Sequence, residues 1–347
     1  MANMYIQSIN HFRAIAIFFV VFGHSFIISD YAPDTFTSQV FYNLAAGGTT
    51  FFVFISGFLF HHLFRSRFDY PDFMIKKTKH VLIPFLILSL IPVLVLYVNY
   101  LASGHPERIL NYSLIRHFLI GVGGFFMGYW YIPFIMIVFL LSPLFRQILK
   151  LPVHFQVIIT VLCLAVSVFL HRGTNLHLYS VIQNVVYFIP VYMLGMIVSE
   201  KRETILDVLK RTEIVFLLIA ILIATLQVFS GNQGNYRKEP FIYAGIDLMI
   251  LQKISLCFFL VIWLNRFETY KERLFELIAS NSFGIFFIHG IIIWLIKAVK
   301  KQHQFSFEHN SFFIYLMMAS AILFTSLLVT VIVKKALPRY GKYLVGN

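Results

Sequence analysis

The chain has 347 residues, of which 59% are hydrophobic and 12% charged, whereas an ordinary soluble domain carries roughly 25% charged residues. Its mean hydropathy of +0.80 leaves too little polar surface to cover a water-soluble globule, which excludes a cytosolic enzyme and a disordered chain. The formal net charge of +13 would suggest nucleic acid binding in a soluble protein, but in a membrane protein the loops on the two sides must first be compared.

Apolar runs long enough to cross a bilayer recur along the chain. A transmembrane helix needs about 20 mainly apolar residues, and the sequence holds ten such runs between charged or turn-rich breaks. They cover residues 12–29, 42–60, 81–101, 126–145, 153–170, 178–198, 214–230, 241–264, 277–296 and 311–333. The runs are apolar on every side, so the sequence predicts an all-α bundle of about ten transmembrane helices rather than a β-barrel. Without a linker or an internal repeat, we expect one domain over residues 1–347.

The distribution of basic residues predicts the orientation. The first run carries Arg13 and His24 and no cleavage site follows it, so it is expected to be an anchor and not a signal peptide. Of the 28 Lys and Arg residues, 18 lie in loops on the side of the two termini, and two, Arg13 and Lys253, lie within runs. The eight in opposite loops are Arg108, Arg116, Arg172, Arg237, Lys238, Lys297, Lys300 and Lys301. This bias places both termini in the cytoplasm and accounts for the charge without nucleic acid.

Few ionisable residues remain inside the runs, and each is a candidate site residue: Arg13, His24, Asp247, Lys253 and His289. A charge at the bilayer centre costs about 3 kcal/mol even on the lenient insertion scale, so such side chains should face the bundle interior or a wet cavity. The alternative is a structural role, in which the polar side chain forms a hydrogen bond to another helix and stabilises the packing of the two helices. Asp247 and Lys253 are six residues apart, about 240° around a helix, so we expect each to find partners on other helices, in roles that stay open.

Arg13 and His24 form the strongest pair, because they are eleven residues apart in one run. Eleven steps of about 100° bring both side chains to one helix face, about 16 Å apart along the axis. A fixed cation suits a phosphate or carbonyl group, and an imidazole suits a general base. The pattern predicts a substrate that extends through the bundle along this face.

Two further segments are candidates for ligand contact, and each also has a structural explanation. Ser56 and Gly57, in the second run, are small enough to let a ligand approach the backbone, although ordinary helix packing explains them as well. Lys76 and Lys79, in the loop before the third run, suit either an anionic ligand or the positive-inside anchor. The two cysteines, in apolar runs, give neither a disulfide framework nor a metal site.

Together these segments resemble the acyltransferase 3 family of bacterial integral-membrane proteins, over most of the chain. The family's first-helix pattern, a basic residue, ten residues and then His, appears as Arg13 to His24. Its Phe-Phe-x-x-Ser-Gly pattern resembles residues 52–57, and its basic motif resembles residues 76–79. Residues 129–132, 142–144 and 282–289 are similar to its later segments. The sequence departs from the family by having Asn10 where Asp is frequent, and Lys where Arg is usual in the basic motif, and Lys cannot make a bidentate contact.

The resemblance implies an O-acyltransferase of the bacterial inner membrane, most often an O-acetyltransferase. Its donor would be cytoplasmic acyl-CoA, such as acetyl-CoA, as a cosubstrate, with no permanently bound cofactor and no metal. Its acceptor would be a hydroxyl of an envelope polysaccharide, exopolysaccharide or lipid-linked glycan, in contact with membrane lipids and polysaccharide synthesis proteins. The expected catalytic residues are His24, as the general base, and Arg13, which would hold the donor or orient the site electrostatically. Lys76 and Lys79 would bind the donor together with Arg13, and the cavity wall would be formed by Ser56, Gly57, Trp130 and His289.

Two other functions fit a many-helix bundle. A glycan transporter or flippase would also bury charges, but such proteins often carry internal repeats with paired broken helices, and none is visible in this sequence. A structural subunit of a polymer synthase would leave the costly intramembrane Arg13 and His24 unexplained. The enzyme is therefore favoured, with the donor's phosphates near Arg13 and its thioester toward His24.

Overall fold

The computed structural model describes residues 5–65, 67–104, 127–174, 177–307 and 311–346, and they are mostly helical. The helices are α1 (Gln7–Ser25), α2 (Phe36–Ala45), α3 (Thr49–Phe64), α4 (Tyr70–Lys77), the π-helical turn η1 (Thr78–Leu82), α5 (Ile83–Ala102), α7 (Tyr131–Leu140), α8 (Ser142–Ile148), α9 (Val153–Leu170), α10 (Tyr179–Glu200), α11 (Arg202–Val208), α12 (Glu213–Phe229), α13 (Leu248–Asn265), α14 (Arg273–Ser280), α15 (Ser282–Gln302), α16 (Phe312–Ala336) and α17 (Gly341–Leu344). The strands β1 (Arg172–Gly173) and β2 (Arg237–Lys238) pair in parallel.

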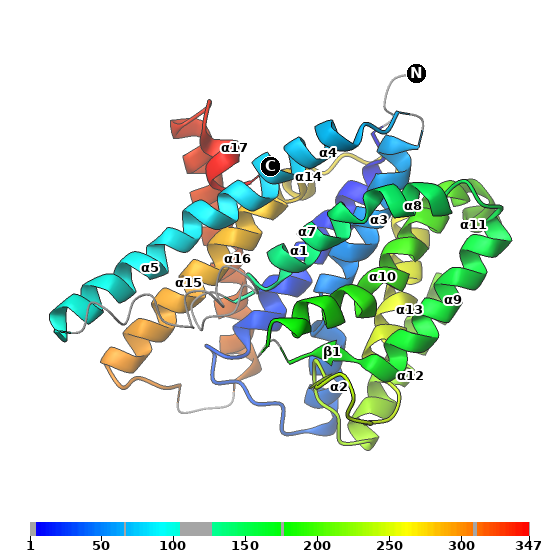
Figure 1. Cartoon of the computed structure of the whole chain (residues 1–347). Helices are drawn as coiled ribbons and strands as arrows, with labels where there is room; N and C mark the ends of the chain where they lie inside the picture. Colours follow the sequence, from blue (N-terminus) through cyan, green and yellow to red (C-terminus); the bar gives the residue numbers. More distant parts are fainter. Residues whose placement is uncertain (1–4, 66, 105–126, 175–176, 308–310, 347) are drawn as a thin grey trace.

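The bundle has two distinct ends (Figure 1). Both chain termini lie at the end where α1 begins, which we call the upper end. The C-terminal end of α1, α2 and β1 lie toward the opposite end, which we call the lower end. Helix α1 thus runs from the upper to the lower end, and the two halves of the predicted site lie toward different ends of the molecule.

Seven helical stretches in the described residues are long and apolar enough to cross a membrane, and nine if each of two bent pairs forms one span. The bent pairs are α7 with α8, which meet at 53°, and α11 with α12, which meet at 86°. The multi-pass helical class is confirmed, whereas the expected number of ten is not reached on these criteria. Helix α1 is not among the nine, because Asn10, His11 and Arg13 lower its apolar content.

Several expected boundaries move for local reasons. The first helix begins at Gln7 instead of residue 12, and the run predicted over 241–264 becomes helical only at Leu248. The segment expected to be a loop before the third run is helical, since α4, η1 and α5 form one stretch from Tyr70 to Ala102. Residue 126 of the fourth predicted run, and Arg108 and Arg116 of the loops predicted to lie opposite the termini, lie outside the described residues.

The centre of the bundle is the packed pair α3 and α10. Buried residues make up 78% of the apolar window of α10 but only 17% of that of α9, which leaves α9 to face lipid. Two glycines let the backbones of α3 and α10 touch. A Cβ on Gly57 would lie 1.9 Å from the carbonyl oxygen of Tyr192, and one on Gly195 would lie 2.1 Å from that of Phe54. Small residues thus permit this close approach, as in other membrane helix pairs.

Asp247 and Lys253 satisfy backbone groups. Asp247 is the N-cap of α13, and its carboxylate accepts hydrogen bonds from the backbone N–H groups of Met249 at 2.7 Å and Ile250 at 3.4 Å. Lys253 Nζ donates to the carbonyl oxygens of Asn43 at 3.2 Å and Leu44 at 2.7 Å, at the C-terminal end of α2. Lys253 therefore finds its partners on another helix, as expected. Asp247 caps its own helix and also interacts with Tyr187 of α10.

Candidate active site

Helix α1 packs against α15, and both of its predicted site residues contact that helix. Arg13 Nη2 donates a hydrogen bond to Ser282 Oγ at 3.2 Å. Toward the lower end, the His24 ring stacks on the His289 ring, with the ring centroids 5.5 Å apart and the planes at 24°. Ser282 and His289 are seven residues apart on α15 and so share one face of it. The face of α1 that carries Arg13 and His24 is thus turned toward α15, which supplies a partner at each position.

The contacts of His289 indicate its tautomer. Its Nδ1 lies 3.1 Å from the backbone carbonyl oxygen of Ile285, and because a carbonyl only accepts, Nδ1 must carry the hydrogen. In the neutral ring Nε2 then bears the lone pair, and this atom is buried without a hydrogen-bond partner in the described part of the chain. His24 is partly accessible, so it is the ring of the pair that a substrate could reach.

Near the start of α1 lies a group of cations that we call the upper cationic site: Arg13, Lys77 and Lys334. Lys77 of α4 and Lys334 of α16 each interact electrostatically with Arg13, and none of the three forms an ion pair with a described carboxylate. Arg13 also lines a cavity of about 180 Å³ with Tyr5, Ile6, Ile9, Asn10, Leu59, His62 and Leu63. Cations without a balancing carboxylate suit the phosphates of a ligand.

The basic motif presents a different lysine from the two that the sequence favoured. Lys76 is exposed and pairs with Asp72 at 2.7 Å, and Lys79 is exposed. Lys77, between them, turns inward over the rings of Phe73 and Phe139, with its Nζ 5.2 and 4.7 Å from the centroids. The signal for Lys77 was present in the sequence, because Phe73 precedes it by four residues, which is helical contact spacing.

A second group of cations, which we call the lower cationic site, consists of Arg172, Arg237 and Lys297, and all three interact electrostatically with His24. The guanidinium of Arg172 lies 4.1 Å from the centroid of the Trp130 ring, so the predicted cavity residue Trp130 contacts a neighbour of His24. Burial lowers the pKa of Arg172, and the adjacent Arg237 lowers it further. The sequence predicts both arginines only as basic residues of the loops opposite the termini.

Ser56 and Gly57 have different surroundings. Ser56 is half-buried and hydrogen-bonds with Tyr131. The Tyr131 ring contacts Phe286, whose ring in turn contacts His289. Gly57 instead points at the backbone of α10, where it allows the close helix packing described above. Ser56 is therefore connected to the histidine pair through aromatic rings, and Gly57 is a packing position.

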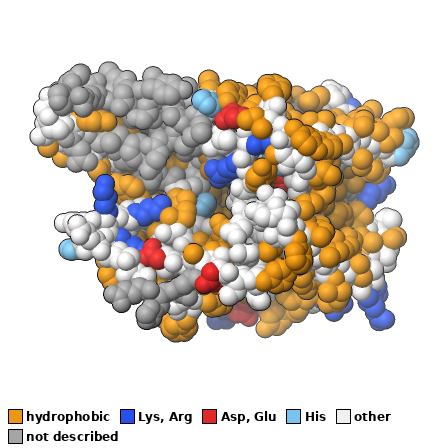
Figure 2. Space-filling model, turned by 90° about the horizontal axis from the view of Figure 1, so that it is seen from below, with side chains coloured by type: hydrophobic (Ala, Val, Ile, Leu, Met, Phe, Trp, Pro, Cys, Tyr) orange, Lys and Arg blue, Asp and Glu red, His pale blue; other side chains and the backbone are white. Residues whose placement is uncertain are grey.

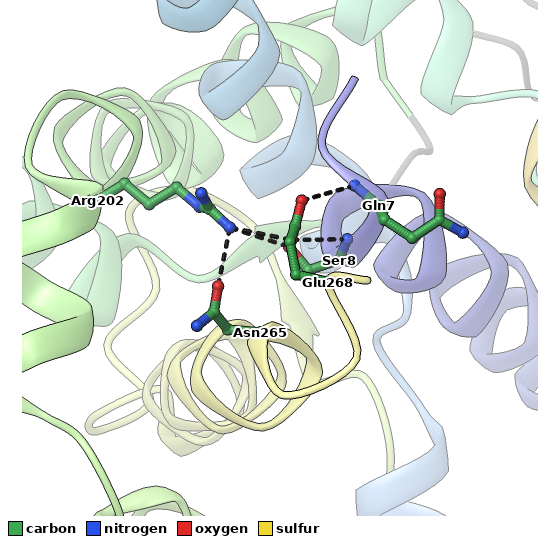
Figure 3. Close-up of polar contacts among 5 residues, drawn as sticks. All are labelled: Gln7, Ser8, Arg202, Asn265 and Glu268. Atoms are coloured by element: carbon green, nitrogen blue, oxygen red, sulfur yellow. Dashed lines mark hydrogen bonds and ion pairs between the residues drawn. The ribbon is translucent and has the colours of Figure 1, made fainter. Parts of the chain in front are cut away.

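The start of α1 is held by a polar network that fixes the position of this helix (Figure 3). The Glu268 carboxylate accepts hydrogen bonds from the backbone N–H groups of Gln7 at 2.9 Å and Ser8 at 3.1 Å. Arg202 Nη2 donates to the same carboxylate at 3.0 Å and to Asn265 Oδ1 at 2.9 Å. A carboxylate at the N-terminus of a helix is favourable, and these contacts connect α1 to α11 and to the end of α13.

Comparison with known families identifies the chain. The acyltransferase 3 model, described as an acyltransferase domain, matches residues 6–335, nearly the whole sequence. No curated protein and no solved structure matches it. The family match covers every described helix from α1 to α15 and almost all of α16. The chain therefore belongs to the acyltransferase 3 family, and it is a multi-pass membrane acyltransferase.

Proposed function

We propose that this protein transfers an acyl group, most often acetyl, from cytoplasmic acyl-CoA to a hydroxyl of an envelope polysaccharide, exopolysaccharide or lipid-linked glycan. One observation carries the proposal. A single face of α1 has Arg13 in an uncompensated cationic site and His24 beside a second imidazole, about 16 Å further along the helix. The separation is comparable to an extended pantetheine arm, so the donor's phosphates would lie at Arg13 and its thioester near His24.

The proposed reaction needs a general base for the acceptor hydroxyl and a binding site that holds the acyl-CoA donor. A ring nitrogen of His24 takes the proton of the acceptor hydroxyl, and the oxygen attacks the carbonyl carbon of the thioester. The C–S bond then breaks, and CoA leaves as a thiolate that takes up the proton from His24. The guanidinium of Arg13, with Lys77 and Lys334, holds the donor phosphates. Since CoA is consumed as a cosubstrate, the reaction requires no prosthetic group.

The orientation is part of the proposal. Both termini lie at the upper end of the bundle (Figure 1), and the loops on that side carry most of the basic residues, which supports a cytoplasmic upper end in the bacterial inner membrane. In this arrangement α1 is a tenth span, surrounded by the apolar helices. Its polar residues are tolerated because they face α15 and α14 instead of lipid.

Two experiments test the two halves of the proposal. Mass spectrometry of envelope glycans from cells with and without the protein should show an acyl mass increment that disappears on deletion and returns on complementation. Identical glycan spectra from the two strains would contradict acyl transfer.

The donor half is tested by binding of a non-hydrolysable acyl-CoA analogue to the purified protein. Arg13→Ala should weaken binding about tenfold or more, the loss expected for a hydrogen bond to a charged group. Arg13→Lys should restore it only in part, because a point charge replaces a planar fork. Wild-type affinity in Arg13→Ala would instead leave Arg13 as a structural contact to Ser282.

A further inference from the structure

The lower cationic site is built on the only paired strands in the described chain. Arg172 of β1 is in register with Arg237 of β2, and neighbouring strands lie about 4.8 Å apart, so the two arginine side chains start from adjacent points. Figure 2 views the lower end of the bundle and shows Lys and Arg side chains near the middle of this face. Two like charges held side by side repel each other, which requires a compensating interaction.

The described residues supply little compensation. Arg172 is only 5% exposed, yet its Nε is buried without a hydrogen-bond partner, and its Nη1 donates to the neutral amide oxygen of Asn235 at 2.9 Å. Asp247 is the one described carboxylate that interacts electrostatically with Arg172, and it caps α13 without forming an ion pair. The Arg237 side chain forms no hydrogen bond or ion pair with a side chain in the described part of the chain, and its electrostatic partner there is Tyr42, which carries no full charge. The pair therefore has unused donors and excess positive charge.

The position of the two strands is fixed by side chains of α10 and the following loops. The Gln183 amide donates to the carbonyl oxygens of Leu170, His171 and Lys238, at 3.1 to 3.3 Å. The backbone N–H of Gly173 donates to Asn184 Oδ1 at 3.0 Å. Because Asn184 holds β1 and Gln183 holds β2 against one helix, the arginines are held in place before any ligand arrives, which lowers the entropic cost of binding one.

The upper cationic site cannot account for this second cluster. Donor phosphates held at Arg13 would lie about 16 Å along α1 from His24, whereas Arg172 and Arg237 interact with His24 itself. The lower cationic site is therefore free to bind a second anion, on the side of the bundle where the acceptor hydroxyl would meet His24 in the proposed reaction.

We infer that the acceptor glycan carries an oxyanion, a carboxylate or a phosphate, close to the acylated hydroxyl, and that Arg172 and Arg237 bind this group. The inference rests on the proposed function and adds the substrate class. The guanidinium of Arg172 lies 4.1 Å from the centroid of the Trp130 ring, and its Nε has no described hydrogen-bond partner. A guanidinium binds carboxylate and phosphate groups with paired N–H donors. The exposed Arg237 and Lys297 draw the acidic glycan toward the site.

The first test uses the glycan that loses its acyl group on deletion of the gene. Its structure, determined by mass spectrometry, should show a carboxylate or phosphate on the acylated sugar or on its neighbour. An acylated repeat unit without an acidic group would overturn the inference and leave acyl transfer intact. Unchanged acyl content on deletion would instead remove the proposed function.

The second test measures acceptor KM with the purified full-length protein and this glycan. Arg237→Gln should raise the acceptor KM about ten- to a hundredfold, the loss expected for contacts to a charged group, with the KM for acyl-CoA unchanged. Arg172→Gln should act in the same direction, and Arg237, with its exposed side chain, serves as the variant that leaves packing intact. The matched control is Lys301→Gln, which removes one exposed charge from the same end of α15. An acceptor KM in Arg237→Gln equal to that of the control would overturn the inference.

The source of the anion is separated by chemical treatment of the same glycan. Reduction of its carboxyl groups and removal of its phosphates are applied separately, and one of the two should raise the acceptor KM for the wild type but not for Arg237→Gln. A higher acceptor KM after carboxyl reduction identifies an acidic sugar. A higher acceptor KM after phosphate removal identifies a phosphorylated or lipid-linked acceptor. Equal KM values for the untreated and both treated glycans would contradict anion recognition.

Discussion

Replacement of Glu268 with Gln should loosen the start of α1. Both carboxylate oxygens are used, one by the backbone N–H of Gln7 and the other by Ser8 and Arg202. A glutamine has one carbonyl oxygen, and its NH₂ group would face a donor, so at least one contact is lost and Arg202 loses its counter-charge. Hydrogen bonds to charged groups contribute about 1.5–3 kcal/mol. The side chains of Glu268 and Arg202 are 31% and 23% exposed, and we therefore expect about 1–2 kcal/mol after screening by water.

Thermal unfolding of the purified protein, followed by intrinsic fluorescence, measures this effect. Glu268→Gln should lower the melting temperature by several degrees relative to wild type. The control is Asp207→Asn in α11, an exposed carboxylate with no described hydrogen bond or ion pair, which should change stability by less than about 0.5 kcal/mol. If the two variants melt at the same temperature, the network of Figure 3 does not hold α1 in place.

The other expectations concern the donor site, the core and the topology. Lys77→Gln should weaken binding of a non-hydrolysable acyl-CoA analogue about tenfold, while Lys76→Gln, whose lysine pairs with an acidic neighbour, should not; equal affinities would remove Lys77 from the site. Gly195→Val should sharply lower the amount of folded protein in the membrane, because its Cβ would collide with the carbonyl oxygen of Phe54; a normal amount measured by immunoblot would disprove this packing. A Lys79→Cys thiol, exposed at the upper end, should react with an impermeant maleimide only after cell lysis, and labelling of intact cells would reverse the orientation.

The class of the fold could be predicted from hydropathy, because a chain with so few charges must bury its backbone in helices within lipid. The common face of Arg13 and His24 could also be predicted, since it follows from the helical repeat alone. Boundaries moved where a side chain caps a helix, as Asp247 does for α13. The number of spans depends on α1. Other helices stabilise its polar face, so hydropathy alone underestimates the ability of α1 to span the membrane.

The neighbours of these residues could not be predicted, because they come from distant parts of the chain. Ser282 and His289 meet α1 only through the packing of α15. The arginines of the lower cationic site are placed by two-residue strands, which are too short to have a hydrophobic period. A sequence motif indicates a residue type and a spacing, whereas electrostatic partners depend on which helices pack together.

The most direct test of the account is the acyl content of envelope glycans in cells whose only copy of the protein carries His24→Ala. The variant should be present in the membrane at wild-type level and should bind the acyl-CoA analogue, because Arg13 and the upper cationic site are unchanged, yet the glycans should lack the acyl group. Normal acylation by this variant at matched abundance would contradict the assignment of His24 as the general base and, with it, the proposed route of the acyl group along α1.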